Sequence, residues 1–220
     1  MNITISNTIK EKYPDMQLAC LTYDCKVGTY HAGTWGEIED RVIPELLKTM
    51  ETMNLTEIEN IHYARLGYRA LGKDPTRYRI SSEAMYRRIK QGKGLYQINT
   101  VVDVNNLVSL ETGFSVGSYD LEHVQGDVVF KLGEEGDSYK GIGKDDINIE
   151  DMPTLSDELG AFGSPTSDSR RAMIGKTASK VLTVIFVFTP NYDMDKLLKE
   201  VKITFEKYAN AKNVETFCIK

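Results

Sequence analysis

Residues 100–113, "TVVDVNNLVSLETG", combine a set of valines and leucines with three polar side chains that stand close together. The apolar content predicts a buried segment, and we expect it to form a helix. Asp103, Asn105 and Asn106 lie in its middle, and a buried amide or carboxylate costs roughly 1–3 kcal/mol unless it is hydrogen-bonded. These three residues are therefore expected either to satisfy a structural network or to line a pocket.

Upstream of this stretch, the sequence predicts a strand and three helices. Capping boxes at Thr34–Glu37 and Thr56–Glu59 indicate where the first two helices begin, because the hydroxyl and the carboxylate each satisfy a free N–H group. Pro44 is expected to kink or divide the first helix, since proline cannot donate the helical hydrogen bond. The expected elements are the strand 17–27 and helices that begin at Thr34, Thr56, and Ser81 or Ser82.

Downstream of Gly113, the sequence pattern changes to short segments typical of β-strands, separated by turns rich in Gly, Asp and Ser. The expected strands are 114–119, 127–132, 138–142, 172–174, 181–188 and 214–219. Residues 134–158 are acidic and are expected to be mostly loop, and Asp193 caps a final amphipathic helix. Helices that are segregated from a mostly antiparallel sheet predict an α+β fold with the helices packed on the sheet.

Length and composition favour one globular domain, 1–220, with two small domains as the alternative, because the chain has 220 residues and is 41% hydrophobic. Its longest apolar run, Val181–Thr189, is far shorter than the roughly 20 residues of a membrane span and is typical of a buried strand. The N-terminal segment has neither the basic start nor the apolar stretch of a signal peptide. We therefore expect a cytoplasmic protein that does not cross a membrane.

Cysteine and histidine usage gives no indication of a metal site. The three cysteines are odd in number and form no C-x-x-C pair, which favours free thiols in a reducing compartment. The three histidines are scattered along the chain, so a zinc site is not expected. We expect no metal and no other cofactor.

Charge is distributed unevenly in this acidic chain, whose formal net charge is −5. Between Arg65 and Lys93 there are nine basic and two acidic residues, a net +7 that leaves −12 for the rest of the chain. A basic segment of this kind is expected either to face a phosphate backbone or small anion, or to form the solvated faces of two helices.

Two short motifs have weak functional readings. Gly113-Phe-Ser115-Val-Gly117 matches G-x-S-x-G, but a serine nucleophile needs a strand before this turn and a helix after it, and here the order is reversed. Gly141-Ile-Gly143-Lys144 lacks the rest of a phosphate-binding loop and is expected to be a hairpin turn. A serine hydrolase and a P-loop enzyme are therefore both disfavoured.

The segment "GAFGSPTSDSRR", residues 160–171, is the more informative loop. Its small residues allow the backbone to approach a ligand closely. Free N–H groups beside several serines, Arg170 and Arg171 would suit a carboxylate or phosphate oxygen. The alternative is a long solvated turn, and the loop considered by itself does not decide between the two.

Two stretches together resemble a known family. They are "INTVVDVNNLVSLETGFSVGSYDLEHVQGDVVFKLGEEGD", residues 98–137, and "LGAFGSP", residues 159–165. In this order they resemble the D-x-x-N, L-E-x-G and Y/F-D-L motifs and the Gly-rich turn of the B3/B4 module in the phenylalanyl-tRNA synthetase beta subunit. The matching residues are Asp103, Asn106, Leu110, Glu111, Gly113, Asp120, Leu121, Gly126 and the Gly160/Gly163 turn.

The resemblance implies a B3/B4-like α+β fold with a mostly antiparallel sheet. It is strongest over 60–190, and a strand–helix part, 1–59, and a helix–strand part, 191–220, are expected to complete the domain. In the synthetase this module hydrolyses mischarged tyrosyl-tRNA. Because the chain is too short for the aminoacylation core and the anticodon-binding domain, we expect a free-standing relative of the editing module and not a ligase.

The resemblance also implies a set of site residues. The expected substrate-binding residues are Asn105, Asn106, Gly117, Gly160, Gly163, Ser164, Asp168 and Ser169, and the expected anion- or RNA-binding residues are Arg77, Arg79, Arg170 and Arg171. Gly117 stands where the family has a histidine that helps to recognise the tyrosine hydroxyl, and no acid stands near 174–176, where the family's acidic partner is expected. A pocket without these partners loses discrimination for a phenol, so tyrosine is not the expected ligand.

Two functions follow from this reasoning, and the catalytic residues are unassigned in both. The first is trans-editing, in which backbone N–H groups of 160–164 stabilise the oxyanion while water hydrolyses the aminoacyl ester of a mischarged tRNA. The second is a non-catalytic module that binds RNA or a small metabolite. The partner is tRNA or an amino-acid-like ligand, and the site is expected where the helix that carries Asn106 meets the turn at Ser164.

Overall fold

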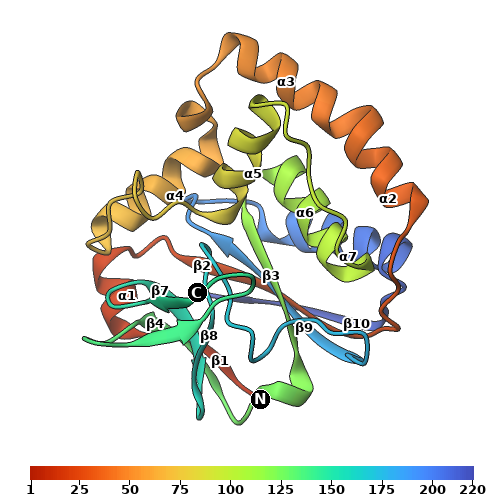
Figure 1. Cartoon of the computed structure of the whole chain (residues 1–220). Coiled ribbons are helices and arrows are strands. Elements are labelled where there is room, and N and C mark those ends of the chain that lie inside the picture. The colour runs from red at the N-terminus through yellow and green to blue at the C-terminus, as the bar shows by residue number, and fades with distance from the viewer.

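Two four-stranded sheets and a layer of helices form the molecule, which the computed structural model describes over residues 1–220 (Figure 1). The strands are β1 (Ile3–Ile5), β2 (Gln17–Asp24), β3 (Ser115–Asp120), β4 (Val128–Leu132), β5 (Ser138–Lys140), β6 (Asp146–Asn148), β7 (Pro153–Asp157), β8 (Gly160–Gly163), β9 (Lys180–Val187) and β10 (Lys212–Ile219). The α-helices are α1 (Asn7–Lys12), α2 (Ala32–Gly36), α3 (Ile43–Thr52), α4 (Glu59–Ala70), α5 (Ser81–Lys90), α6 (Thr100–Thr112) and α7 (Met194–Tyr208). The fold class is α+β, as expected.

The larger sheet has the strand order β10-β2-β9-β3, and all neighbouring strands in it are antiparallel. Its central strands are apolar on both faces, since Leu18 and Cys20 of β2 face one side while Ala19 and Leu21 face the other. The expected strand at 181–188 is confirmed as β9, which is buried from Val181 to Val187. This sheet therefore separates two hydrophobic cores.

The smaller sheet has the strand order β1-β4-β7-β8, in which β1 and β4 are parallel and the other neighbours are antiparallel. Its inner face packs against the larger sheet through residues such as Phe130 and Phe162. A separate two-stranded ribbon, β5-β6, lies within residues 134–158. The short β-like pieces of the sequence do not predict that β1 pairs in parallel with β4, nor how the two sheets are connected.

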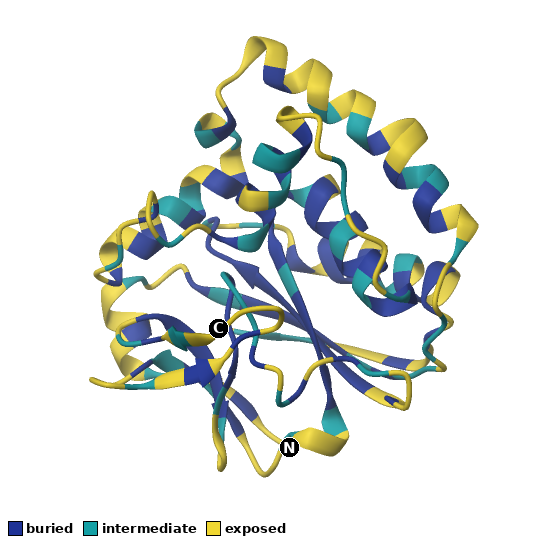
Figure 2. Cartoon of the chain, in the orientation of Figure 1, coloured by how far each residue is buried: buried dark blue, intermediate teal, exposed yellow.

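The helices α2, α3, α5, α6 and α7 gather on the face of the larger sheet that points away from the smaller one (Figure 1). Colouring by burial shows α6 dark almost throughout, whereas α3 and α7 each keep one exposed face (Figure 2). Helix α6 is the centre of this layer, so residues 100–112 form the core of the helical half of the molecule. No helix has the length and apolar character needed to cross a bilayer.

Local signals explain the limits of α6. The Asn99 side chain caps its first turn by accepting hydrogen bonds from the N–H groups of Val101 and Val102, at 3.1 and 3.0 Å. Gly113 ends the helix in the left-handed conformation, with φ of 78°, which a residue with a side chain adopts only with strain. Within the helix, Asp103 accepts hydrogen bonds from Trp35 Nε1 at 2.8 Å and from the Ile98 N–H at 2.9 Å. Asp103 is therefore part of a structural network.

The two expected capping boxes are wrong, because other groups satisfy the helix starts. Thr34 lies inside α2, whose cap is His31, and its N–H donates to His31 Nδ1 at 3.3 Å. The box before α4 is formed by Asn54 and Glu57, two residues earlier than expected. Pro44 does divide the first helix, since a π-helical segment, Glu37–Val42, precedes α3, and Pro44 lies in the first turn of α3.

Helix α5 begins at Ser81, but neither serine caps it with its side chain. The Ser81 N–H donates instead to the Pro165 carbonyl at 2.7 Å, and the Ser82 N–H donates to Ser115 Oγ at 3.4 Å. The start of α5 is thus stabilised by segments that are far away in the sequence. Ser115 is buried in this contact, so its hydroxyl is not exposed as the nucleophile of a serine hydrolase would be.

Three regions differ from the expected elements. Residues 134–158 contain β6 and β7, and the Gly-rich stretch at 160–163 is strand β8, so much of the expected loop is a β7-β8 hairpin. Residues 172–174 form only an isolated bridge between Met173 and Tyr119 and not a strand. The N-terminal elements β1 and α1 were not expected. These pieces are three to six residues long, and their pairing with distant strands decides their conformation.

Candidate functional site

A short turn, Ser164–Asp168, follows strand β8 and lies at the edge of the core between the two sheets. Within the turn, Ser164 Oγ donates to the Ser167 carbonyl at 2.7 Å and accepts from the N–H groups of Thr166 and Ser167. The Ser164 N–H donates to Asp168 Oδ1 at 3.0 Å. Such local hydrogen bonds fix the backbone, so the turn is rigid and not a solvated loop.

Three tyrosines from three different elements hold this turn. Tyr119 of β3 donates to Asp168 Oδ1 at 2.9 Å, and Tyr139 of β5 donates to the Ser167 carbonyl. Tyr68 of α4 shares a hydrogen bond of 2.7 Å with the hydroxyl of Thr166. Burial raises the phenol pKa of all three tyrosines, so they stay neutral and act as hydrogen-bonding anchors.

Asp168 has the electrostatic properties of a proton acceptor near neutral pH. Burial raises its carboxyl pKa to about 6, against the opposing effect of the hydrogen bonds from Ser164 and Tyr119. Both of these donors bind Oδ1, and Oδ2 has no partner within the protein. One oxygen is thus held by two donors, and the other accepts no hydrogen bond from the protein.

The phenol of Tyr119 fills the space next to Gly117 and Gly163. A Cβ atom placed on Gly117 would lie 2.1 Å from the Tyr119 hydroxyl oxygen, and one placed on Gly163 would lie 2.3 Å from it. Neither glycine therefore has room for a side chain while Tyr119 keeps this position. Glycine at 117 allows the tyrosine two residues later on the same strand face to reach Asp168.

A cavity of about 500 Å³ lies beside the turn, between the β5-β6 ribbon and the β7-β8 hairpin. It is lined by Gly160, Ser169 and Arg171 from the expected set, together with Tyr139 and Ser156. Gly160 is exposed at the hairpin tip with φ of 105°, and Ser169 is buried. The Gly-rich segment therefore borders a cavity of ligand size, which its sequence suggested.

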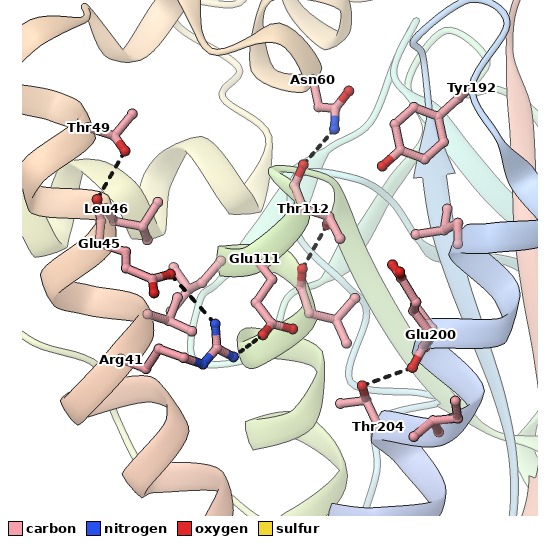
Figure 3. A pocket seen from close by; sticks show the side chains of 16 residues that line it. Arg41, Glu45, Leu46, Thr49, Asn60, Glu111, Thr112, Tyr192, Glu200 and Thr204 are labelled. Atoms are coloured by element: carbon pink, nitrogen blue, oxygen red, sulfur yellow. Dashed lines mark hydrogen bonds and ion pairs between the residues drawn. The ribbon is translucent and has the colours of Figure 1, made fainter.

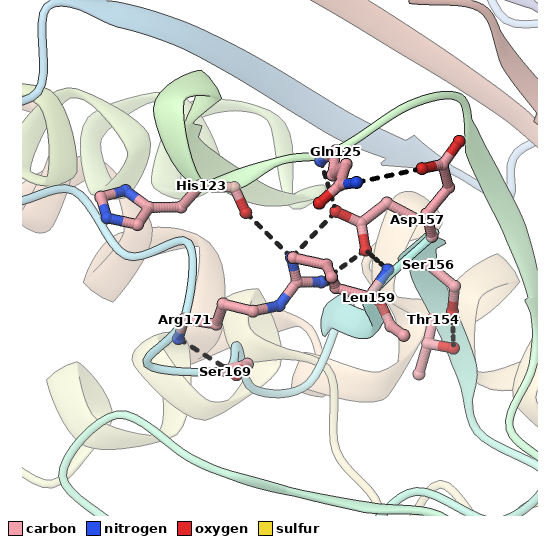
Figure 4. A network of polar contacts seen from close by, with 10 residues as sticks. His123, Gln125, Thr154, Ser156, Asp157, Leu159, Ser169 and Arg171 are labelled. Carbon is pink, nitrogen blue, oxygen red and sulfur yellow. Dashed lines mark hydrogen bonds and ion pairs between the residues drawn. The ribbon is translucent and has the colours of Figure 1, made fainter.

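Arg171 is fully occupied by contacts within the protein (Figure 4). Its guanidinium forms a bidentate ion pair with Asp157 at 2.8 and 2.9 Å and donates to the carbonyls of His123 and Gly160 at 2.9 and 2.8 Å. Burial would raise the pKa of Asp157, but the hydrogen bonds from Arg171 outweigh it and hold that pKa below its usual value. Arg171 thus ties the hairpin tip to the segment after β3.

The other expected anion-binding arginines are spread over two regions. Arg170 donates to the carbonyls of Gly141 and Lys144, at 2.9 and 3.2 Å, and so holds the β5-β6 turn. Arg79 forms a long ion pair of 3.9 Å with buried Glu83. Arg77 is exposed and has no ion pair, with its guanidinium 5.7 Å from the Tyr78 ring centre. The basic segment is therefore partly an internal ion-pair network.

Asn105 lies on the other face of the larger sheet. Its Oδ1 accepts from Ser118 Oγ at 2.8 Å, and Ser118 in turn contacts the Thr183 hydroxyl at 2.6 Å, within the helical layer. Ser118 and Tyr119 are neighbours on β3 and point to opposite faces. Strand β3 therefore separates Asn105 from the Ser164–Asp168 turn.

Asn106 is half-buried on α6, and its side chain makes no hydrogen bond within the protein. It lines neither the 500 Å³ cavity beside the turn nor the larger cavity of the helical layer. The expectation that one cavity joins the asparagines to the turn is wrong for Asn105, because a sheet lies between them. No three histidine, cysteine, aspartate or glutamate side chains are grouped as metal ligands.

Comparison of the chain with known protein families identifies the family to which it belongs. The family model described as the B3/4 domain matches residues 64–218, which include the turn, its three tyrosine anchors and both asparagines. The chain belongs to the B3/4 domain family. The resemblance inferred from the D-x-x-N and Gly-rich motifs is thereby confirmed.

Two relatives of this B3/4 domain protein are beta subunits of the same enzyme. The phenylalanine–tRNA ligase beta subunit of Cutibacterium acnes (strain DSM 16379 / KPA171202) is 35% identical over 71 residues, which are 32% of this chain and 8% of that protein. A crystal structure of an N-terminal fragment of the phenylalanyl-tRNA synthetase beta subunit from Pyrococcus horikoshii is 10% identical, covers 99% of this chain and 50% of that one, and has a TM-score of 0.48. The chain thus spans only part of each relative's length.

Sequence reasoning missed the tyrosine anchors of this B3/4 domain. Twelve tyrosines are present, and nothing in their spacing distinguishes Tyr68, Tyr119 and Tyr139 from the rest. They come from a helix and two strands that meet only in the folded chain. Asp168 was among the expected residues, but its raised pKa depends on this burial.

Proposed function

We propose that this B3/4 domain hydrolyses an aminoacyl ester at the 3′ end of a tRNA, with Asp168 as the general base. The relatives named above are subunits of a phenylalanine–tRNA ligase, which supports the choice of substrate class. The observation that carries the proposal is the position of the Asp168 carboxylate. Its Oδ1 is fixed by Tyr119 and Ser164, while its Oδ2 accepts no hydrogen bond from the protein.

In the proposed reaction, Oδ2 of Asp168 accepts a proton from a water molecule as the water oxygen forms a bond to the ester carbonyl carbon. The bond between that carbon and the ribose oxygen then breaks, and the proton passes from Asp168 to the leaving ribose oxygen. The products are a free amino acid and uncharged tRNA. A pKa of about 6 leaves the carboxylate mostly ionised at neutral pH while keeping it basic enough to accept the proton.

The test measures the release of labelled amino acid from a panel of correctly charged and mischarged aminoacyl-tRNAs. Asp168→Asn keeps an oxygen for Tyr119 and Ser164 but cannot accept the proton, so we expect it to lower the hydrolysis rate by roughly 100-fold or more. Asp40→Asn is the matched control, because Asp40 is exposed in the helical layer and has no ion pair. Equal rates in the wild type and Asp168→Asn, with a wild-type circular dichroism spectrum, would remove Asp168 from the mechanism.

A non-catalytic binding module is the second candidate, and the inward-turned arginines favour it. Arg170 and Arg171 donate to backbone carbonyls and to Asp157, which leaves less free cationic charge for tRNA phosphates near the turn. This function predicts that an amino-acid-like ligand raises the melting temperature although no charged tRNA is hydrolysed. Titration of uncharged tRNA at low and high salt separates the partners, because phosphate contacts make affinity strongly salt-dependent.

A further inference from the structure

A further cavity lies in the helical layer, away from the Ser164–Asp168 turn. It is a groove of about 710 Å³ between α3, the C-terminal end of α6, and α7 (Figure 3). None of the residues expected from the sequence to bind a ligand lines it. The volume is within the range of small-molecule sites, roughly 300–1,000 Å³.

The floor of this groove is apolar. Each of three helical segments contributes a pair of aliphatic side chains, and these are Val42 and Leu46, Val108 and Leu110, and Leu197 and Val201. Five of the six side chains are buried in the core of the helical layer, and Leu46 packs against that core. A hydrocarbon chain that lay on this floor would gain roughly 25 cal/mol for each Å² of apolar surface removed from water.

The threonine hydroxyl groups around the groove offer acceptors and no free donors. Thr49 on α3, Thr112 on α6 and Thr204 on α7 each donate to the carbonyl four residues earlier on their own helix, at 3.0, 2.7 and 3.0 Å. Their protons are thus used. Thr112 Oγ1 also accepts from the Phe114 N–H at 3.2 Å, whereas the oxygens of Thr49 and Thr204 accept no hydrogen bond within the protein. Asn60 is also engaged, because its amide donates to the Thr112 carbonyl and its oxygen accepts from Thr189.

The charged groups at the rim are mainly acidic. Arg41 is the only lining cation. It forms ion pairs with Glu45 and Glu111 (Figure 3), and a third with Glu37 outside the groove. On the opposite wall, the carboxylate of Glu200 has only a long ion pair of 4.0 Å with exposed Lys196. The groove therefore has an excess of negative charge and of hydrogen-bond acceptors.

The Tyr192 hydroxyl is the remaining polar group of the groove. Burial raises the pKa of its phenol, a side-chain hydrogen bond with Asn60 opposes that rise, and the nearby Glu200 carboxylate adds to it. Figure 3 shows Tyr192 and Glu200 on the α7 side of the groove, across from Arg41 and Glu111. A phenol oxygen and a carboxylate on the same wall form a polar end to the apolar floor.

We propose that this groove binds a linear aliphatic amine, with the ammonium group against Glu200 and the Tyr192 hydroxyl and the hydrocarbon chain on the apolar floor. An ammonium group brings three donors and a positive charge to a rim that is acidic and rich in acceptors. An anionic or acceptor-rich ligand would meet the weakly paired Glu200 carboxylate and hydroxyl groups whose protons are already used. The site is separate from Asp168, so this proposal does not depend on the hydrolytic function.

The test is calorimetric titration of the full chain with n-hexylamine, n-hexanol and n-hexanoate, combined with ¹H–¹⁵N chemical-shift mapping. We expect saturable binding of hexylamine, weaker binding of hexanol, and none of hexanoate. Shifts should concentrate on α3, on the end of α6 and on α7. Glu200→Gln should weaken hexylamine binding roughly tenfold, and Tyr192→Phe should weaken it by a smaller factor.

Glu206→Gln is the matched control, because Glu206 is exposed on the same helix, pairs with Lys202 and does not line the groove. Its dissociation constant for hexylamine should equal that of the wild type. Hexanol binding as tightly as hexylamine would overturn the role of the ammonium group. The absence of saturable hexylamine binding, or unchanged affinity in both Glu200→Gln and Tyr192→Phe, would overturn the site itself.

Discussion

Asp103 and Asp168 are both aspartates held in the interior, one in the helical layer and one at the edge of the core between the sheets, and burial raises the pKa of each. Their partners differ. Asp103 is fully buried, and each of its oxygens accepts a hydrogen bond, from Trp35 and from the Ile98 N–H. Asp168 has both donors on one oxygen. A carboxylate whose two oxygens are satisfied holds structure, whereas one with a free oxygen is available for chemistry.

The same substitution at the two positions should affect stability differently. Asp103→Asn places an amide N–H₂ against the Trp35 N–H or the Ile98 N–H, and we expect it to lower the free energy of unfolding by about 3 kcal/mol at pH 7. Asp168→Asn retains an acceptor for Tyr119 and Ser164 and removes a buried charge. The free energy of unfolding should therefore stay the same or rise. Urea titration of both variants measures the difference.

Comparable losses in the two variants would contradict this distinction, since they would mean that the Asp168 carboxylate is as structural as that of Asp103. The control is Asp40→Asn, which should change the free energy of unfolding by less than about 0.5 kcal/mol because Asp40 is exposed. A variant of Asp168 that is stable and inactive would sharpen the distinction most.

The pH dependence of stability should follow Asp168. Its pKa in the folded chain, about 6, is higher than the usual 3.8, so the folded state binds a proton that the unfolded state has released. The contribution of Asp168 to the free energy of unfolding is therefore fully present below pH 4 and is lost as the pH rises through about 6. The loss amounts to about 2 to 3 kcal/mol. Asp103 contributes with the same sign.

Asp168→Asn should remove most of this decline between pH 4 and pH 7.5, and Asp40→Asn should leave it in place. Thermal or urea unfolding at a series of pH values measures it. An identical decline in Asp168→Asn and the wild type would assign the effect to other carboxyl groups.

The smallest expected effect concerns the anchor of Asp168. Tyr119→Phe removes the hydroxyl that donates to Oδ1, so the carboxylate loses a stabilising partner and its pKa should rise further. The free energy of unfolding should fall by about 1 kcal/mol. Tyr139→Phe is the matched control, because Tyr139 donates to the Ser167 carbonyl and not to the carboxylate. The pKa of Asp168 in both variants can be measured by carboxyl ¹³C titration. An equal change of that pKa in the two variants would contradict a specific role of the Tyr119 phenol.

Most of the longer elements could be predicted, because their signals are local. The strand at 181–188, the helix at 100–113 and the final helix capped by Asp193 carry enough apolar residues at the right period to form in almost any packing. The family also follows from local motifs, since a few residues at fixed spacing identify it.

The candidate site could be predicted only in part. Its Gly-rich segment and Asp168 stand out as small and polar residues next to each other. The structure places Gly160 and Ala161 at the wall of a cavity and Asp168 in the turn that follows β8, where it does not line that cavity. Asn105 was assigned to the same site, but whether a buried amide faces a ligand or a neighbouring strand depends on which face of β3 its helix covers. Here α6 covers the face of β3 that carries Ser118, and the Asn105 side-chain oxygen accepts a hydrogen bond from that serine.

The order of apolar and polar residues therefore decides the helices, the long strands and the family, since these depend on neighbours within a few positions along the chain. Packing decides which oxygen of an aspartate is free, which tyrosines reach a turn and where a groove stays open between helices. These properties depend on residues from distant parts of the chain, and neither burial nor direction in space is encoded in the spacing of any single segment.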